Sequence, residues 1–136
     1  MANKIYHNNI TKFRELIPKK LTISIVGFGY IGTCIGAVLA SKGLRVIGID
    51  INEKIVKNIN KGLTIFQEPF LSEYISSAHK SNMIKASVKY DSISISDIII
   101  ITVGTPLNDD LSPNLDHIKE ACESVGNNLK EGSLVI

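Results

Sequence analysis

The chain has 136 residues, of which 44% are hydrophobic, so it is long enough to form one domain with a buried core. Its 15 lysines and arginines against 13 acidic residues give a formal net charge of +2, which does not indicate a dedicated nucleic-acid binder. Two cysteines without C-x-x-C spacing, and apolar runs far shorter than the roughly 20 residues that span a bilayer, exclude a disulfide framework and a membrane span and predict a cytoplasmic protein without a metal site.

Residues 1–20 precede the first predicted strand and are expected to form an N-terminal extension. The segment is basic, and its apolar residues are spaced for one face of a short helix that Pro18 would end. We expect this helix to lie on its own domain or on a partner subunit; the alternative is a helix that binds a partner protein or a membrane surface. The apolar face comprises Ile10, Phe13, Leu16 and Ile17.

Residues 21–50 carry the clearest functional signal. Residues 21–26 are mostly β-branched, residues 27–32 read Gly-Phe-Gly-Tyr-Ile-Gly, and residues 44–49 form a second apolar run that ends at Asp50. Between the glycines and the second run, apolar residues recur at helical spacing. This pattern predicts a strand, a phosphate-binding turn, a helix and a second strand ending in a carboxylate, which is the arrangement that binds dinucleotides.

Each glycine of the motif has a predicted role. Gly27 allows a tight turn, Gly29 lets a pyrophosphate approach the backbone, and Gly32 lets the helix pack close to the strand. The helix N-terminus offers unpaired N–H groups to the phosphates. Asp50 can accept hydrogen bonds from both adenosine ribose hydroxyls and would repel a 2′-phosphate, so the sequence predicts NAD rather than NADP.

Two helices are predicted after Asp50. The first is expected to end before Gly62, and the second to begin at Pro69 and run to about His79, which we expect at the surface. Glu68 either reaches a ligand or stabilises the start of the second helix, because acids are favourable there. The apolar side of the first helix comprises Ile51, Ile55 and Ile59.

An unbroken apolar run at 97–103 predicts a strand buried on both faces of a parallel sheet. Before it, residues 83–88 are expected to form a short strand and residues 90–96 a turn or short helix. Loops at the carboxyl ends of strands line the ligand crevice of such a sheet, so the following Gly104-Thr105-Pro106 should face the glycine-rich turn. The alternative is a turn that merely ends the strand.

The remainder of the chain predicts one more helix and one more strand. Asp109 and Asp110 are expected to be solvated, because neighbouring acids in a loop rarely converge on a metal. Asn114 or Asp116 would cap the helix, and residues 133–136 begin a strand. Since domain boundaries belong in loops, a chain that stops inside a strand is expected to be a fragment of a longer one. The apolar face of the helix comprises Leu115, Ile118, Cys122, Val125 and Leu129.

The alternation of strands and helices predicts an α/β fold of the Rossmann type. We expect a doubly wound, mainly parallel sheet with helices on both faces, truncated in its last strand. Residues 21–136 would form the dinucleotide-binding domain, and residues 1–20 the extension.

Several segments also stand in the order and spacing of the NAD-binding domain of UDP-sugar 6-dehydrogenases, the family of UDP-glucose, UDP-N-acetylglucosamine and UDP-N-acetylmannosamine dehydrogenases. The resemblance covers residues 21–136. Tyr30 within the glycine motif, together with the Thr105-Pro106 turn, makes it more specific than a general dinucleotide fold. The segments are Gly27–Gly32, Gly48–Asn52, Ile59–Gly62, Gln67–Pro69, Val103–Pro106 and Pro113–Leu115.

The resemblance implies an activity. The family oxidises the C6 alcohol of a UDP-sugar to a carboxylate with two NAD, and a cysteine thiolate captures the intermediate aldehyde. That cysteine lies beyond this length of chain, and neither Cys34 nor Cys122 has its sequence setting, so both are expected to pack within helices. The chain alone is therefore expected to be inactive, to meet its UDP-sugar through domains absent here, and to belong to a homo-oligomer as a full-length protein.

Carried over to this sequence, the glycine motif would hold the pyrophosphate, Asp50 the adenosine ribose, and residues 103–106 the middle of the dinucleotide. One departure is Ile55, which stands where many members have a basic residue. The alternatives are a related dehydrogenase of the 6-phosphogluconate or hydroxyacid type and a non-catalytic dinucleotide-sensing domain. The predicted cofactor-binding residues are Gly27, Phe28, Gly29, Tyr30, Ile31, Gly32, Asp50, Val103, Gly104, Thr105 and Pro106; no catalytic or metal-binding residue is predicted.

Overall fold

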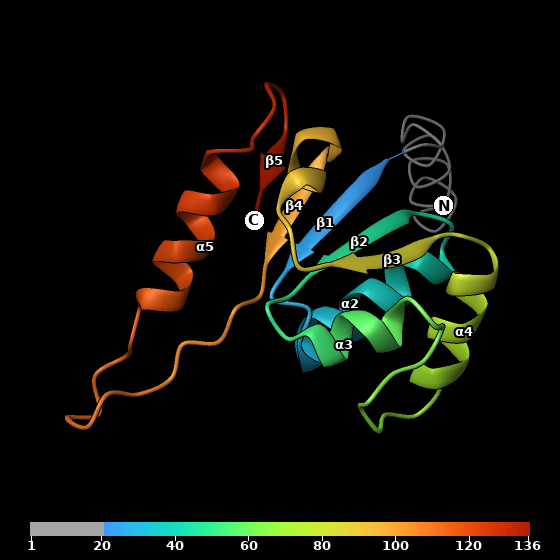
Figure 1. Cartoon of the computed structure of the whole chain (residues 1–136), viewed down its shortest axis with the longest axis horizontal. Coiled ribbons are helices and arrows are strands. Elements are labelled where there is room, and N and C mark those ends of the chain that lie inside the picture. The colour runs from blue at the N-terminus through green and yellow to red at the C-terminus, as the bar shows by residue number, and fades with distance from the viewer. Residues whose placement is uncertain (1–20) are drawn as a thin grey trace, which may run out of the picture.

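The computed structural model describes residues 21–136, which form a parallel five-stranded sheet in the order β3-β2-β1-β4-β5 (Figure 1). The predicted helix in residues 1–20 lies outside the described residues. The predicted Rossmann-type architecture is confirmed. In chain order the elements are β1 Thr22–Val26, α2 Tyr30–Ser41, β2 Arg45–Ile49, α3 Glu53–Ile59, α4 Leu71–Lys80, β3 Ile84–Ser87, the 3-10 helix η1 Asp91–Ile95, β4 Ile98–Ile101, α5 Asp116–Gly126 and β5 Leu134–Val135.

The register of the sheet brings three strand ends together. Val26, the last residue of the central strand β1, pairs with Ile49 of β2 on one side and with Ile101 of β4 on the other. Backbone bonds continue this alignment past the strands, because Gly27 N–H donates to the Ile49 carbonyl at 2.8 Å and Thr102 N–H to the Val26 carbonyl at 2.7 Å. The residues that follow β1, β2 and β4 therefore meet at one edge of the sheet.

Helices cover both faces of the sheet, as a doubly wound fold requires. On one face α2, α3 and α4 pack over a core that includes Ile25 and Phe28 (Figure 1). On the other face α5 packs through Ala121 and Val125 against Val26 and residues of β2 and β4. The connection between β3 and β4 takes the chain from one face of the sheet to the other. In such folds the ligand crevice lies where the strand order reverses, which here is at the carboxyl ends of β1 and β4.

Helix α2 lies close to the sheet because the residues it buries are small. They include Gly32, Thr33, Gly36, Ala37 and Ala40. The Thr33 hydroxyl donates to the Phe28 carbonyl at 2.8 Å, which ties the first turn of the helix to the preceding loop. No helix within residues 21–136 is long and apolar enough to cross a membrane.

Two predictions about α3 and α4 are wrong in detail. Ile51 does not belong to the buried side of α3, because the helix begins at Glu53 and Ile51 lies in the preceding turn with 86% of its surface exposed. Helix α4 begins at Leu71 rather than Pro69. The cause is Phe70, whose φ of 63° is left-handed and cannot continue a helix.

The predicted burial of β4 and α5 is also partly wrong. Of the four residues of β4 only Ile99 is fully buried, in the core on the α5 side, whereas Ile98 and Ile100 are half-buried against the core on the other face. On α5 the buried residues are Ala121 and Val125, whereas Cys122 is exposed and does not pack in the core as expected. Helix α5 has Leu115 at its N-cap position without a side-chain cap, but the Asn114 side chain accepts from the Asp116 N–H at 2.9 Å.

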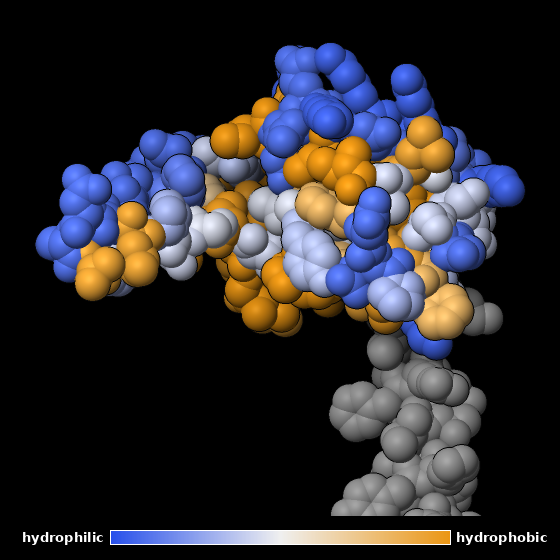
Figure 2. Space-filling view, turned by 90° about the horizontal axis from the view of Figure 1, so that it is seen from below, coloured by the Kyte–Doolittle hydropathy of each residue, from blue (hydrophilic) through white to orange (hydrophobic). Residues whose placement is uncertain are grey.

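The segment between β4 and α5 extends away from the body of the molecule (Figures 1 and 2). An antiparallel bridge pairs Leu107 with Pro113 near its end. Leu107 and Leu111 are exposed, and Asp109 and Asp110 lie in solvent as expected. Within residues 21–136 no group of three or more His, Cys, Asp or Glu side chains is placed to hold a metal ion.

Candidate functional site

The glycine-rich turn joins β1 to α2 and has the backbone that its glycines predict. Gly27 has a φ of 84°, and a Cβ there would lie 2.7 Å from the Val103 nitrogen. A Cβ on Gly32 would lie 2.4 Å from the Gly27 carbonyl oxygen. Gly29 differs, because nothing lies within 4 Å of its added Cβ. The first and third glycines thus permit close packing within the protein, while the second faces open space that a ligand can enter.

Helix α2 begins at this turn without any protein group to cap it. Gly29 is the N-cap, no side chain bonds to the first N–H groups, and the first turn contains no acid. The first N–H groups of a helix lack intrahelical partners and carry a partial positive charge. This helix start is therefore suited to an anion such as a pyrophosphate.

The Thr102 hydroxyl holds the turn in place from the neighbouring strand. It donates to the Gly27 carbonyl at 2.8 Å and lies 3.3 Å from the Val26 carbonyl. The sequence singled out Thr105 for its hydroxyl, but Thr105 is exposed in the extended segment. The hydroxyl that contacts the glycine-rich turn belongs instead to the residue directly after β4.

Asp50 follows β2 and is oriented by the backbone on both sides. Its N–H donates to the Ser87 carbonyl at 3.2 Å, and its Oδ1 accepts from the Asn52 N–H at 2.8 Å. The other carboxylate oxygen, Oδ2, has no hydrogen-bond partner within residues 21–136. A fixed carboxylate with one available oxygen at this edge is suited to accept hydrogen bonds from a ligand hydroxyl.

A pocket of about 210 Å³ lies where these groups meet, between the sheet edge and α5. It is smaller than the roughly 300–1,000 Å³ clefts that hold drug-sized ligands, so it fits part of a dinucleotide. The ends of β1, β2 and β4, the residue before η1 and the start of α5 all contribute to its wall. The lining residues are Gly27, Gly29, Ile49, Asp50, Ile51, Tyr90, Thr102, Val103, Gly104, His117, Glu120 and Ala121.

The pocket includes some of the predicted residues and excludes others. Those that line it are Gly27, Gly29, Asp50, Val103 and Gly104. Phe28 is fully buried in the core, and Gly32 packs within the protein. Those outside the lining are Phe28, Tyr30, Ile31, Gly32, Thr105 and Pro106.

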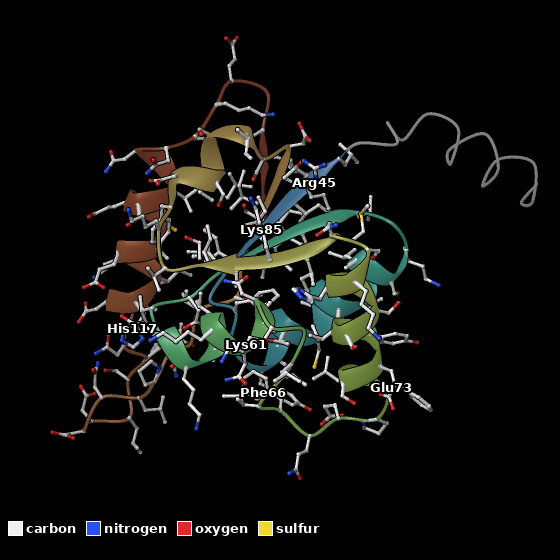
Figure 3. All side chains as sticks on the ribbon, turned by 45° about the vertical axis from the view of Figure 1, so that its right-hand side comes forward. Arg45, Lys61, Phe66, Glu73, Lys85 and His117 are labelled. Atoms are coloured by element: carbon white, nitrogen blue, oxygen red, sulfur yellow. The ribbon has the colours of Figure 1, made fainter. Side chains whose placement is uncertain are left out.

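Three polar residues of the pocket wall are not among the predicted cofactor-binding residues. Tyr90 is half-buried, and burial raises the pKa of its hydroxyl, with a further contribution from the carboxylates of Asp50 and Glu120. Figure 3 shows His117 near the start of α5. His117 and Glu120 are three positions apart, so they share one face of the helix. That spacing, combined with the expected position of α5 beside the sheet edge, is the signal that could have found them.

Glu68 and Cys34 lie near the start of α2 but outside the pocket wall. The Glu68 carboxylate accepts a hydrogen bond from the Tyr30 hydroxyl, and α4 begins at Leu71, three residues later, without a side-chain cap. Cys34 is half-buried, and burial, followed by the charge of Glu68, raises the pKa of its thiol. A thiol with a raised pKa is a poor nucleophile at neutral pH, which agrees with a packing role for Cys34.

Comparison with known proteins identifies relatives over the same residues. The family model described as the NAD-binding domain of the UDP-glucose/GDP-mannose dehydrogenase family matches residues 21–136. UDP-N-acetyl-D-mannosamine dehydrogenase of Campylobacter jejuni is 38% identical over 115 residues, which are 84% of this chain and 28% of that protein. The Escherichia coli K12 enzyme of the same name is 36% identical, over 85% of this chain and 27% of its own length.

Solved structures agree with the sequence relatives. The UDP-D-ManNAc dehydrogenase of Pyrococcus horikoshii superposes with a TM-score of 0.80 and 30% identity, over 85% of this chain and 27% of that chain. A UDP-glucose dehydrogenase of Pyrobaculum islandicum gives a TM-score of 0.79 and 29% identity, over 85% and 28% respectively. The chain therefore spans little more than a quarter of the length of the proteins that it matches.

Proposed function

The chain belongs to the UDP-glucose/GDP-mannose dehydrogenase family and is its NAD-binding domain, and from this premise we propose that it serves an enzyme that oxidises the C6 alcohol of a UDP-sugar to a carboxylate with two NAD. The observation that carries the proposal is the meeting of Gly29, the free start of α2 and Asp50 around one pocket. Relatives named UDP-N-acetyl-D-mannosamine dehydrogenase support the substrate class.

We assign the adenosine half of NAD to the pocket beside Asp50. The volume of about 210 Å³ suits one half of a dinucleotide, and Asp50 Oδ2 is available for a ribose hydroxyl. Ile51 and Ala121 supply apolar wall for the base. The absence of a basic residue at Ile55 does not affect this assignment, because Ile55 is buried in the core away from the wall.

The pyrophosphate is assigned to the start of α2 and the nicotinamide half to the side of Val103 and Gly104. The N–H groups at the start of α2 lie next to Gly29, whose missing side chain leaves the approach open. NAD accepts hydride when it is bound in the complete enzyme. The residues that line the pocket are assigned to binding and orienting the cofactor.

Two carboxylates in the pocket wall favour NAD over NADP. Asp50 and Glu120 both line the pocket and both raise the pKa of Tyr90, so each lies near its hydroxyl. A 2′-phosphate placed there would meet like charges, which repel most strongly where solvent is excluded. Glu120 thus adds to the discrimination that the sequence assigned to Asp50 alone.

Substitution of the ribose carboxylate tests this assignment. Asp50→Asn should weaken the binding of NAD about tenfold, because hydrogen bonds to a charged group contribute more to the binding free energy than hydrogen bonds between neutral groups. The preference for NAD over NADP should narrow in the same variant. Calorimetric titration of both cofactors into the 136-residue chain measures this, with Asp109→Asn on the exposed segment as the matched control. An Asp50→Asn variant that binds NAD as the wild type does would contradict the assignment.

The complete reaction is proposed for a longer chain. Cys34 is half-buried on α2 and Cys122 is exposed on α5, and neither lines the pocket. We expect the 136-residue chain to bind NAD and to produce no NADH from UDP-sugars, which absorbance of NADH would detect. NADH formation by this chain alone would overturn that expectation. We further propose that the full-length protein contacts its sugar through other domains, acts in the cytoplasm and assembles as a homo-oligomer.

A further inference from the structure

Tyr30 and Glu68 join the start of α2 to the loop between α3 and α4. The Tyr30 hydroxyl donates a hydrogen bond to Glu68 Oε1. The Tyr30 ring also meets the Phe66 ring edge-on, with centroids 5.8 Å apart and planes at 82°. Figure 3 shows Phe66 on the loop that precedes α4. One side chain from the glycine-rich motif thus makes a polar and an aromatic contact with the same distant loop.

The loop at 63–70 has few other hydrogen bonds that fix its middle, where the half-buried Phe66 packs against the larger core. Its internal bonds are Phe66 N–H to the Thr64 hydroxyl at 3.1 Å and, at its end, Leu71 N–H to the Glu68 carbonyl at 3.2 Å. Phe70 is left-handed and 70% exposed, and α4 begins without a side-chain cap. The packing of Phe66 on the core and on the Tyr30 ring, together with the hydrogen bond from Tyr30 to Glu68, therefore holds the middle of this loop in place.

The Glu68 carboxylate lies over the first turn of α2. Its hydrogen bond raises the pKa of Tyr30, and its charge adds to the effect of burial in raising the pKa of Cys34, one helical turn further on. An acid near a helix N-terminus is stabilised by the helix dipole. Glu68 lies beside the first turn of α2, which contains no acid of its own, and its carboxylate bonds to the Tyr30 hydroxyl rather than to the first N–H groups of the helix.

We propose that the Tyr30–Glu68 pair positions the loop at 63–70 and the first turn of α2 for NAD, so that Tyr30 is a positioning residue rather than a cofactor contact. Tyr30 does not line the pocket, but Gly29, its neighbour, does. Fixing the Tyr30 side chain fixes the direction of the first N–H groups of α2, which are assigned to the pyrophosphate. The inference rests on the proposed function and adds two side chains to it.

Removing either side of the Tyr30–Glu68 hydrogen bond should weaken the binding of NAD by a similar amount. Tyr30→Phe removes the donor and keeps the ring on Phe66, whereas Glu68→Ala removes the acceptor. We expect each to raise the Kd for NAD about three- to tenfold, in the range of one lost hydrogen bond. Glu68→Gln keeps a neutral acceptor and should lie between them and the wild type. The double variant should bind no worse than either single variant, because both remove the same bond.

Two exposed residues of α4 provide matched controls. Tyr74→Phe removes a hydroxyl from a tyrosine of similar exposure, and Glu73→Gln neutralises an acid that bonds only to the adjacent Ser72. Neither should change the Kd for NAD in calorimetric titration of the 136-residue chain. Equal affinities for Tyr30→Phe, Glu68→Ala and these controls would overturn the proposal.

Hydrogen exchange of the NAD-free chain provides a second measurement. The Phe66 amide, bonded within the loop, should exchange several-fold faster in Tyr30→Phe and Glu68→Ala than in Tyr74→Phe. Faster exchange with unchanged NAD affinity would mean that the pair holds the loop without positioning the cofactor, and would overturn the proposal. If the wild-type protein fails to bind NAD, the proposed function and the positioning role are both contradicted. Unchanged exchange and affinity in variants of an NAD-binding wild type would remove the inference alone.

Discussion

Phe28 is the residue of the glycine motif whose structural role differs most from its predicted one. The sequence predicts that Phe28 contacts the cofactor, but its ring is fully buried in the larger core. The ring fills the space above two glycines, since an added Cβ would lie 2.7 Å from it at Gly36 and 2.4 Å from it at Gly48. The glycine-rich turn is therefore anchored in the core by the aromatic residue between its first two glycines.

This packing predicts that Gly48→Ala destabilises the fold. The new methyl group would overlap the Phe28 ring, which is surrounded by core and cannot move without cost. Overpacking of a core costs about 1–3 kcal/mol in the free energy of unfolding, which urea denaturation measures. Gly126→Ala is the matched control, because nothing lies within 4 Å of its added Cβ and alanine favours a helix. Equal stability of Gly48→Ala and Gly126→Ala would show that Phe28 is not confined.

The same residues show what the motif can and cannot predict. Gly27 and Gly32 are required by backbone geometry, which a local pattern encodes, so their conformational roles could be predicted. Tyr90, His117 and Glu120 reach the pocket through the packing of distant elements, and the spacing of His117 and Glu120 points to the pocket only once α5 is placed beside the sheet edge. The Phe28 ring lies in the core and the Tyr30 side chain lies outside it. Both positions depend on partners elsewhere in the fold, at Gly48 for Phe28 and at Glu68 for Tyr30.

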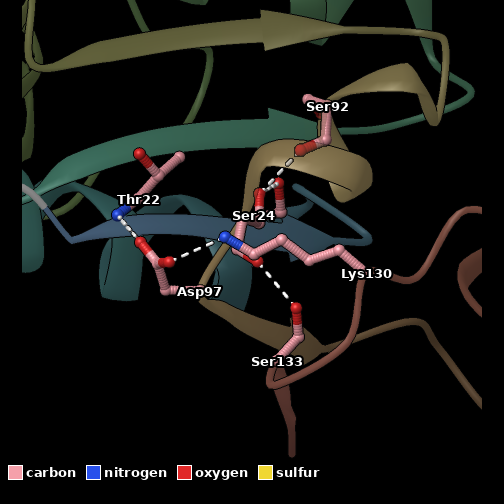
Figure 4. A network of polar contacts seen from close by, with 7 residues as sticks. Thr22, Ser24, Ser92, Asp97, Lys130 and Ser133 are labelled. Carbon is pink, nitrogen blue, oxygen red and sulfur yellow. Dashed lines mark hydrogen bonds and ion pairs between the residues drawn. The ribbon is translucent and has the colours of Figure 1, made fainter.

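The strands are held at the end opposite the pocket by a polar network (Figure 4). Asp97, just before β4, accepts from the Thr22 N–H of β1 at 2.9 Å and from Lys130 Nζ at 2.8 Å. Beside it, Ser96 donates to the Ser92 carbonyl, so the hydroxyl of Ser24 must be the donor in the 2.7 Å contact between Ser24 and Ser96. The network joins β1, β4 and the segment that leads to β5.

The network predicts a pH dependence of stability. Lys130 and the Thr22 N–H lower the pKa of Asp97 below its ordinary value. A lowered carboxyl pKa stabilises the fold above the unfolded pKa of about 3.9, and this stabilisation is lost as the pH falls through the folded pKa. Asp97→Asn should therefore lower the free energy of unfolding at pH 7 and reduce its loss on acidification.

Urea denaturation at several pH values measures this effect. Asp109→Asn is the control, because Asp109 lies exposed on the extended segment. Lys130→Met should lower the free energy of unfolding at pH 7 by less than Asp97→Asn does, since the Thr22 N–H still donates to Asp97. Parallel stability curves for wild type and Asp97→Asn between pH 7 and the acid limb would contradict the prediction.

Most elements could be predicted in order, because the hydrophobic period changes clearly from strand to helix along this chain. The errors have local causes. The predicted start of α4 differs from the observed one because a left-handed Phe70 has no sequence signature, whereas Pro69 has a strong helix-start preference. The predicted buried face of α5 differs from the observed one because apolar spacing cannot show how much of a helix its neighbours cover. There the small Ala121 makes the contact, and Cys122 points to solvent.

The two sides of the sheet differ in how completely residues 21–136 cover them. Three helices share the larger core, whereas α5 and the short 3-10 helix η1, through Ile93, contribute to the smaller one. Apolar residues therefore remain exposed around α5 and β5. They include Leu115, Leu129, Leu134, Val135 and Ile136. The molecule thus combines one well-covered face of the sheet with an apolar edge at β5.

The open edge of β5 predicts self-association of the 136-residue chain. The N–H groups of Leu134 and Ile136 donate to the carbonyls of Asp97 and Ile99, at 3.0 and 2.9 Å, so the intervening Val135 points its backbone groups outward. Within residues 21–136 no strand pairs with that side of β5. An unpaired edge with apolar side chains is a template for pairing with another chain. Sedimentation velocity at rising protein concentration should therefore show growing oligomers.

A proline at this edge tests the cause. Val135→Pro removes the outward N–H and sacrifices no bond to β4, so it should keep the protein monomeric where the wild type associates. Val135→Thr has a similar shape and retains the N–H, so it should still associate. Equal association of wild type and Val135→Pro would show that the β5 edge is not the contact, and equal loss in Val135→Thr would assign the contact to the side chain. The expected order, in which only proline prevents association, follows because a sheet extends through backbone hydrogen bonds.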